Sequence, residues 1–308
     1  MLNNRFGEEL FRVLNLLDEG LRIYRHGFVS FMLLTSIWVV PCAVGIGLSI
    51  IFSMEWIGVL AVLLALPLAL LLVHALGRAV LIVQHNQPLH LGTTLLNSLA
   101  PVRLIGMGCY SFIFLFLVQI VTTVIYFVCL CPGISGFSFL LGGLAGVPSD
   151  SALGTGVAII VGTLVGVLFI LFYAFSLVMS GATYTSLVYA LQPFVQDNLG
   201  FGKAMERSMA LVGYRLASNV LAFLVTSMVF GATTISVTVT IGMMLPFPLL
   251  LALGEESLAA QGISVFAWIV GLIVVIPPLP IWMALLYQRN VAAWEGHDLA
   301  KRIAEVRA

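Results

Sequence analysis

Charged side chains are scarce in this 308-residue chain, because Asp, Glu, Lys and Arg together make up 8% of it and hydrophobic residues 61%. The mean hydropathy is +1.14. A soluble globule of this length needs more polar surface than such a composition supplies. The composition therefore excludes a water-soluble domain and predicts an integral membrane protein.

The chain also lacks the alternation of polar and apolar residues that is typical of membrane β-strands, since its apolar runs are long and continuous. About 20 apolar residues are needed for a helix to cross a hydrocarbon layer roughly 30 Å thick. Six blocks reach this length, at 28–53, 57–83, 104–131, 157–180, 218–245 and 263–287. We therefore expect an all-α membrane protein with six transmembrane helices.

Groups of acidic residues, histidines and cysteines with metal-ligand spacing are missing from the sequence. His85 and His90 are five residues apart, so a helix would not place both imidazoles on one face. On a helix, Cys129 and Cys131 would point about 200° apart, which makes a disulfide between them unexpected. We expect no metal, no cofactor and no enzymatic activity.

Basic residues are unevenly distributed along the chain. All 13 Lys and Arg lie in the N-terminal arm, in the C-terminal tail, or at the connections between blocks two and three and between blocks four and five. The other three connections carry acidic residues and no basic one. Since basic loops stay in the cytoplasm, both termini are predicted to lie on the cytoplasmic side of the cell inner membrane.

A short amphipathic pattern occurs three times. In residues 201–215, FGKAMERSMALVGYR, apolar side chains recur at helical spacing, and residues 91–103 and 6–17 repeat the spacing. The three apolar stripes are Phe201, Met205, Met209 and Val212; Leu91, Leu95, Leu99 and Val102; and Phe6, Leu10, Leu14 and Leu17. Because each copy precedes two apolar blocks, we expect three hairpins, each preceded by a cytoplasmic amphipathic interfacial helix.

This repeat divides the chain, taken as one polytopic domain over residues 1–308, into seven parts. They are an amphipathic arm (1–27), a first hairpin (28–83), a second amphipathic segment (84–103), a second hairpin (104–191), a third amphipathic segment (192–215), a third hairpin (216–287) and a cytoplasmic tail (288–308).

Two ionisable residues lie in the second block. His74 and Arg78 are four residues apart and therefore share one helix face. An ionisable residue at membrane depth is a functional candidate. The alternative, which the position near the end of the block favours, is that Arg78 extends to the headgroups and His74 forms a hydrogen bond with a neighbouring helix.

Three further segments should depart from a regular span. Pro277, Pro278 and Pro280 predict a break in the sixth helix, a feature that often lines binding sites in transporters. The apolar, glycine-rich residues 132–156 are expected to dip back into the membrane or to lie on its outer surface. The fourth apolar block continues to residue 191 and is too long, so a break is expected at Ser180-Gly181.

Two short motifs carry a family resemblance. Ala204, Arg207 and Ser208 precede the penultimate span, and the chain closes with Tyr287, Glu295, Gly296, Asp298 and Leu299. This arrangement resembles the membrane domain fused to some bacterial glycerophosphodiester phosphodiesterases, which also occurs alone in polytopic proteins. The resemblance implies the fold and the membrane location. The hydrolytic activity of the fused enzymes belongs to a separate soluble barrel, for which these 308 residues have no room.

Arg207 is the residue for which the motifs predict a specific contact. On a helical wheel it lies about 200° from both Met205 and Met209, so it should point away from their stripe. It can then contact headgroup phosphates or pair with an acid of the tail, either Glu295 or Asp298. We expect the pair.

Two functions are consistent with these patterns. The first is a non-enzymatic membrane module that interacts with lipids or organises a membrane or cytoplasmic protein partner. The second is a small-solute transporter or a lipid translocator, suggested by the kinked spans, the prolines and the His74/Arg78 pair. Few polar groups lie deep in the spans, which favours the first. Nucleic acid is not an expected partner.

The charge distribution makes the topology testable. Reporter fusions after Glu55, Asp150 and Glu256 should report the outer side, and a fusion after Arg307 should report the cytoplasm, because the connections without basic residues are the ones translocated. An external C-terminal reporter would contradict the six-span arrangement.

Overall fold

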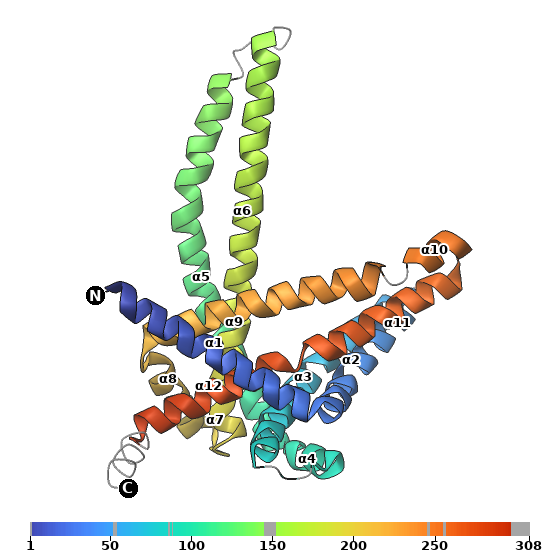
Figure 1. Ribbon diagram of the computed structural model, residues 1–308, viewed down its shortest axis with the longest axis vertical. Helices are drawn as coiled ribbons and strands as arrows, with labels where there is room; N and C mark the ends of the chain where they lie inside the picture. Colours follow the sequence, from blue (N-terminus) through green and yellow to red (C-terminus); the bar gives the residue numbers. More distant parts are fainter. Residues whose placement is uncertain are drawn as a thin grey trace.

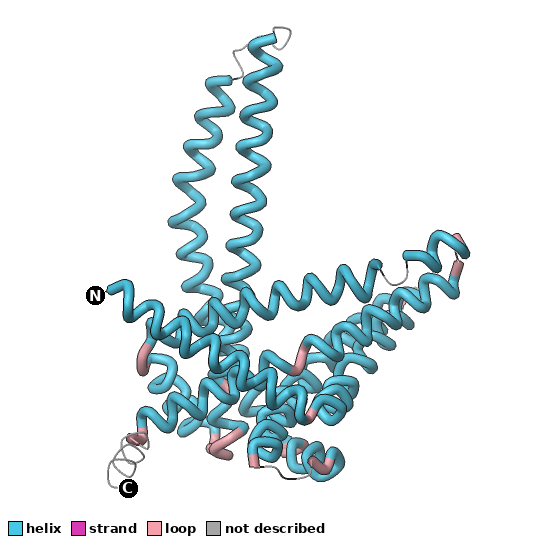
Figure 2. Tube along the Cα trace, viewed as in Figure 1, coloured by secondary structure: helices cyan, strands magenta, loops and turns pink. Residues whose placement is uncertain are grey.

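The computed structural model describes residues 2–51, 54–85, 87, 89–144, 152–244, 247–254 and 257–296. Within these ranges the chain is helical and contains no strand (Figure 2). The helices are α1 (Leu2–His26), α2 (Phe28–Ile51), α3 (Glu55–Gln84), α4 (Leu91–Ser98), α5 (Pro101–Leu144), α6 (Ala152–Ala190), α7 (Gln192–Val195), α8 (Phe201–Gly213), α9 (Leu216–Val237), the π-helix η1 (Thr238–Met244), α10 (Phe247–Leu253), α11 (Leu258–Val275) and α12 (Pro278–Trp294).

Six helical segments of the described chain are long and apolar enough to cross a membrane, which confirms the predicted class of protein. They are Phe28–Ser49, Trp56–Gln84, Pro101–Val124, Leu171–Val195, Leu216–Ile241 and Gly262–Trp294. The last of these is the most buried inside the protein. Figure 1 shows α1 lying against α12, the second helix of this span.

The break predicted at the prolines is present. Within the sixth span, α11 ends at Val275 and α12 begins at Pro278. Pro278 has no backbone N–H, so the carbonyl four residues earlier, at Val274, loses its helical donor. The hydroxyl of Tyr24 on α1 replaces it and donates to the Val274 oxygen at 2.8 Å. Burial raises the pKa of Tyr24 to about 12, so the hydroxyl keeps its proton.

The N-terminal helix buries one residue of the predicted stripe, Leu17, and turns another, Leu14, outward. Leu14 of the expected stripe is 48% exposed, and the buried residues are Val13, Leu16, Leu17 and Tyr24. Gly20 sets this register, because a Cβ there would lie 2.3 Å from Cδ1 of Trp282. The indole of Trp282 fills the space instead and donates through Nε1 to the Leu17 carbonyl at 3.0 Å.

The second amphipathic segment is two helices and not one. Its helix α4 ends at Ser98, and α5 starts at Pro101, because proline is accepted at the first position of a helix but not within one. Thr94 and Ser98 are buried against the protein, while Val102 of the expected stripe is 84% exposed.

The third segment divides its stripe between the protein and the outer surface. The buried residues of α8 are Ala204, Ser208 and Leu211, whereas Phe201 and Met209 are exposed. Ala204 and Ser208 are small, so α8 can approach its neighbours closely on that face. The other two stripe residues, Met205 and Val212, are partly buried and pack against the hydrophobic core.

Two expected irregularities are absent from the described residues. The helix α5 continues through Pro132 to Leu144, so no re-entrant turn occurs within 132–144. Its 44 residues extend about 66 Å, roughly twice the hydrocarbon thickness. Apolar segments favour helix where water is excluded, since helix pairs every backbone group internally. Figure 1 shows α5 and α6 projecting together away from the other helices.

No break occurs at Ser180-Gly181, because α6 continues to Ala190. Gly181 serves close packing instead. A Cβ on it would lie 2.1 Å from the Ser227 hydroxyl of α9, and that hydroxyl donates to the Val178 carbonyl at 3.2 Å. The glycine lets α6 and α9 pack side by side.

The cap on Val274 can be tested by Tyr24→Phe, which removes one hydroxyl and no bulk. We expect a loss of about 1–3 kcal/mol in the free energy of unfolding, because a buried carbonyl is left without a donor. Tyr184→Phe is the matched control, since Tyr184 is exposed. Thermal or denaturant unfolding in detergent gives the measurement, and equal stability of the two variants would contradict the cap.

Candidate functional site

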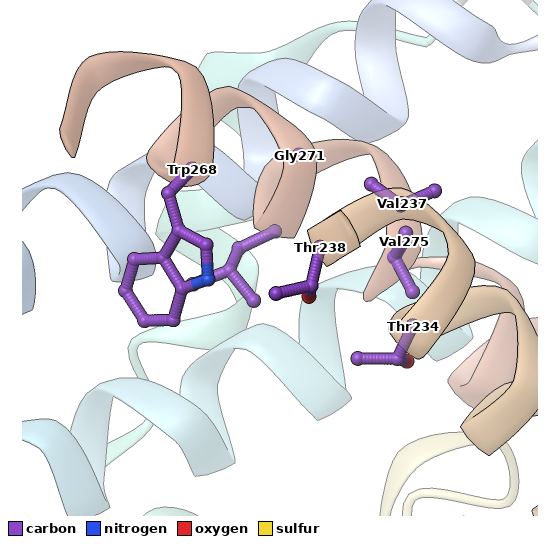
Figure 3. A pocket seen from close by; sticks show the side chains of 7 residues that line it. Thr234, Val237, Thr238, Trp268, Gly271 and Val275 are labelled. Carbon is purple, nitrogen blue, oxygen red and sulfur yellow. The ribbon is translucent and has the colours of Figure 1, made fainter. Parts of the chain in front are cut away.

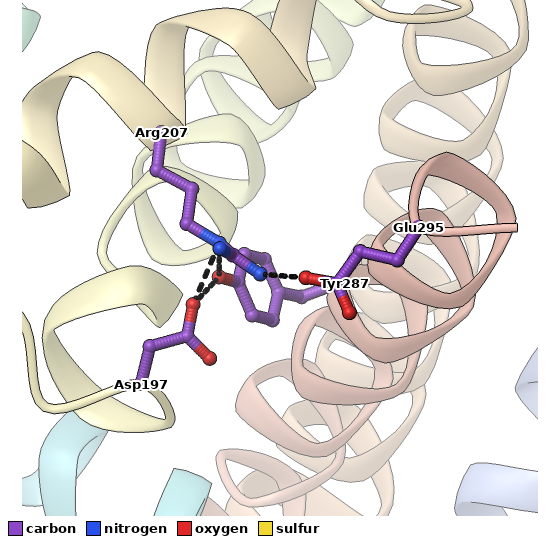
Figure 4. A network of polar contacts seen from close by, with 4 residues as sticks. All are labelled: Asp197, Arg207, Tyr287 and Glu295. Atoms are coloured by element: carbon purple, nitrogen blue, oxygen red, sulfur yellow. Dashed lines mark hydrogen bonds and ion pairs between the residues drawn. The ribbon is translucent and has the colours of Figure 1, made fainter. Parts of the chain in front are cut away.

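Arg207 is the centre of a network of polar contacts between α8 and α12 (Figure 4). Its Nε lies 2.8 Å from the Asp197 carboxylate and 3.2 Å from the Tyr287 hydroxyl, and its Nη2 lies 2.7 Å from Oε1 of Glu295. The Tyr287 hydroxyl in turn donates to Asp197. One guanidinium thus joins α12 to the loop between α7 and α8.

Local backbone features bring these groups together. Asp197 follows α7 and precedes Asn198, whose positive φ of 58° turns the chain towards α8. Glu295 is the C-cap residue of α12 and is followed by Gly296, with a φ of 74°, a conformation that favours glycine. Tyr287 is buried within α12.

The Arg207–Glu295 contact predicted from the two motifs is present. Asp298, the other proposed acid, lies outside the described residues. The sequence reasoning missed Asp197 and the role of Tyr287. Asp197 is the only acid between Asp150 and Glu206, so its position beside a basic segment was a usable signal.

The network keeps Arg207 charged. Burial by itself would lower the pKa of Arg207, but the hydrogen bonds to Glu295 and Tyr287 and the charge of Asp197 outweigh it and raise the pKa above its ordinary value. Two carboxylates already share this one cation, so the network has no spare positive charge for an anionic ligand. We therefore interpret it as a structural clamp.

Other contacts hold α8 on its remaining sides. Ser208, beside Arg207, shares a hydrogen bond of 2.7 Å with the Tyr110 hydroxyl of α5. At the end of α8, the Asn219 side chain lies within hydrogen-bonding distance of the carbonyls of Leu211, Val212 and Tyr214. These carbonyls belong to the last turn of the helix, where intrahelical donors run out.

A second polar group lies where α3 meets α5. His74 is fully buried, and its Nε2 lies 3.2 Å from Nη1 of Arg103. A guanidinium only donates, so Nε2 is the acceptor and the ring is neutral with its proton on Nδ1. Arg78, one turn further along α3, reaches the side-chain oxygen of Asn198 at 3.4 Å. The expectation that His74 bonds a neighbouring helix is confirmed.

Arg78 and Arg103 differ from the arginines that form ion pairs, as does Arg215, which lies over the Tyr214 ring. Arg12, Arg207 and Arg289 each form an ion pair with a carboxylate, whereas neither Arg78 nor Arg103 has one among the residues that the structure describes. A pocket of about 270 Å³ opens beside them, and Arg103 and Asn198 are part of its wall.

The prolines of the last span do not line an open space. Pro278 and Pro280 are buried in the core, with Pro277 at the bend before them. The nearby depression between α9, η1 and α11, lined by Thr234, Thr238, Trp268 and Gly271 among others, leaves no room for a water molecule (Figure 3). Packing side chains fill the region next to the break.

Within the described ranges, no three His, Cys, Asp or Glu side chains gather in a metal-binding group. Comparisons with protein families, with curated proteins and with solved structures find no significant match. The resemblance to the membrane domain of glycerophosphodiester phosphodiesterases stays an expectation carried by the two motifs.

The clamp can be tested with Arg207→Ala, Glu295→Ala and the double variant. Hydrogen bonds to charged groups contribute about 1.5–3 kcal/mol to the free energy of unfolding. The contribution of the Glu295 contact is smaller, because the Glu295 side chain is partly exposed to solvent. Arg207→Ala should therefore destabilise the protein more than Glu295→Ala, because Asp197 also loses its partner. The double variant should be no less stable than Arg207→Ala.

Lys203→Ala is the matched control on the same helix, since Lys203 is exposed. It should leave the unfolding midpoint in detergent unchanged. Additive losses from Arg207→Ala and Glu295→Ala would contradict the coupling.

Proposed function

We propose that this integral membrane protein is a non-enzymatic module that interacts with membrane lipids through amphipathic helices at the cytoplasmic interface. The observation that carries the proposal is the outward placement of apolar side chains on helices too short or too polar to span. Leu96 on α4, Leu99 just after it, and Phe201 and Met209 on α8 are all exposed.

The circumference of α8 is divided into three sectors. Taking Phe201 as zero and about 100° per residue, the buried Ala204, Ser208 and Leu211 lie at about 280–340°. The stripe of Phe201, Met205, Met209 and Val212 covers about 0–80°, and Lys203, Glu206 and Arg207 cover about 140–240°. A helix with separate protein, apolar and charged sectors is suited to lie in a membrane surface, with each sector in its preferred surroundings.

The clamp on Arg207 gives this helix a fixed rotation. Arg207 is tied to α12, Ser208 to α5, and Asn219 binds the last turn. With the protein side fixed, the exposed part of the apolar stripe, Phe201 and Met209, points away from the bundle. The placement of basic residues supports the cytoplasmic side as the location of this surface.

Transport is the less supported alternative. Its strongest sequence feature was the proline break, and the residues that follow the break, from Pro278 to Tyr287, are almost all buried against neighbouring helices. A buried segment of this kind contributes packing and does not form the wall of a path for a solute.

Spin labels test the interfacial placement in lipid nanodiscs. Labels at Leu99 and Met209 should be accessible to oxygen, which partitions into lipid, because both stripes face the hydrocarbon boundary. Labels at Asn97 and Glu206, exposed residues on the same two segments, are the matched controls and should be accessible to a water-soluble paramagnetic nickel complex. The nickel complex reaching all four labels equally would overturn the proposed function.

A further inference from the structure

We propose that the pocket between the start of α5 and the α7–α8 loop binds the phosphate of an anionic phospholipid. This inference rests on the proposed function, since it assigns one specific lipid site to the same surface. The pocket measures about 270 Å³ and joins residues far apart in sequence, with Arg103 and Gly106 on one wall and Phe194, Asn198 and Phe201 on the other. Its size suits a headgroup rather than a whole lipid.

The pocket is positively charged, and no carboxylate lines it among the residues that the structure describes. Arg103 lines the pocket directly. Arg78 does not line it but contacts the side-chain oxygen of the lining residue Asn198 at 3.4 Å. The nearest carboxylate in sequence, Asp197, is held by Arg207 at 2.8 Å. Two arginines at the edge of an apolar layer without a carboxylate favour an anion as a third partner.

His74 fixes the direction of Arg103. Its neutral ring accepts one N–H of the guanidinium at 3.2 Å, deep in α3. This contact uses one of the five donors of Arg103 and leaves others for a ligand, in the planar arrangement that matches phosphate oxygens. His74 therefore acts as a positioning residue and not as a ligand.

The backbone adds donors on the other wall. The helix α8 begins at Phe201 after Gly200, and no side chain caps its first turn. Gly200 and Phe201 both line the pocket. The free amides of a first helical turn and the helix dipole favour an anion there, which reinforces the two arginines.

The rim of the pocket is apolar and accounts for the choice of a lipid over a free phosphate ester. Val102 and Phe201 stand exposed at the mouth, while Phe194 is buried in the wall. A ligand with a phosphate against Arg103 would pass its attached chains over Val102 and Phe201, onto the surface that we propose faces the membrane. A soluble phosphate ester would leave this rim in water.

Binding of phosphatidylglycerol to the detergent-solubilised protein, followed by native mass spectrometry and by the shift in unfolding temperature, tests the site. The wild type should bind phosphatidylglycerol more tightly than zwitterionic phosphatidylcholine. Arg103→Gln should weaken the binding of phosphatidylglycerol roughly tenfold, because a charge-assisted contact is lost. Arg22→Gln removes an exposed charge elsewhere and should leave the affinity unchanged.

A second pair of variants keeps every charge in place. A Cβ at Gly106 makes only ordinary contacts, 3.8 Å from Phe201 and 3.9 Å from Phe194, so Gly106→Ala is a tolerated control. Gly106→Leu adds bulk to the pocket wall and should reduce binding as strongly as Arg103→Gln. It carries the test by itself if Arg103→Gln does not fold.

The results test the site, its assignment to a lipid and the interfacial surface separately. Wild-type affinity in both Arg103→Gln and Gly106→Leu would overturn the site. Binding of glycerol 3-phosphate as tight as that of phosphatidylglycerol would overturn the assignment to a lipid. Neither result alters the spin-label pattern of α4 and α8, so a failure of the pocket is distinguishable from a failure of the interfacial surface.

Discussion

The burial of the interrupted last span is the constraint on which the rest of the structure depends. Proline at 278 removes a helical donor, and an unpaired carbonyl in an apolar interior is costly. Tyr24 supplies the missing donor to Val274, and Trp282 returns a hydrogen bond to the Leu17 carbonyl of the same helix. These two contacts hold α1 against α11 and α12 and set the face of α1 that turns inward.

The same span organises the polar interior on its other side. Asn290 of α12 donates to Tyr189 of α6 and to Asn219 of α9, each at 2.8 Å, and Asn219 binds the end of α8. Tyr287 and Glu295, on either side of Asn290, bind Arg207 of α8. Hydrogen bonds satisfied in this way inside an apolar bundle give each helix a defined partner. The rotation of α8 about its axis is fixed as a result.

The sequence predicted the features that depend on local chemistry. Span length follows from hydropathy, and the break at Pro277 and Pro278 follows from the missing N–H, so both were found in place. Arg207 and Glu295 were paired because they belonged to the two distinctive motifs and carried opposite charges. These predictions required only hydropathy and the two motifs, and no information about which helices are neighbours.

The predictions that failed concern features that depend on the side chains of a neighbouring helix. Several stripes fit a helical period in α1, and only the Trp282 indole beside Gly20 selects one. Gly181 suggests a break from sequence alone, yet the Ser227 hydroxyl opposite makes it a packing position. The stripes of α4 and α8 are each divided between core contacts and the outer surface, because periodicity identifies an apolar face without telling lipid from protein. Asp197 was missed for a related reason, as its partner lies in another helix.

The contact between Tyr24 and Val274 joins residues 250 positions apart, which affects how the chain can assemble. Synthesis releases α1 long before α11 and α12, so α1 has to wait for most of the chain before its inward face finds these partners. During that time Val13, Leu16 and Tyr24 need another apolar environment. A helix lying on the membrane surface provides one, so the N-terminal arm can rest against lipid until the final span arrives and displaces it.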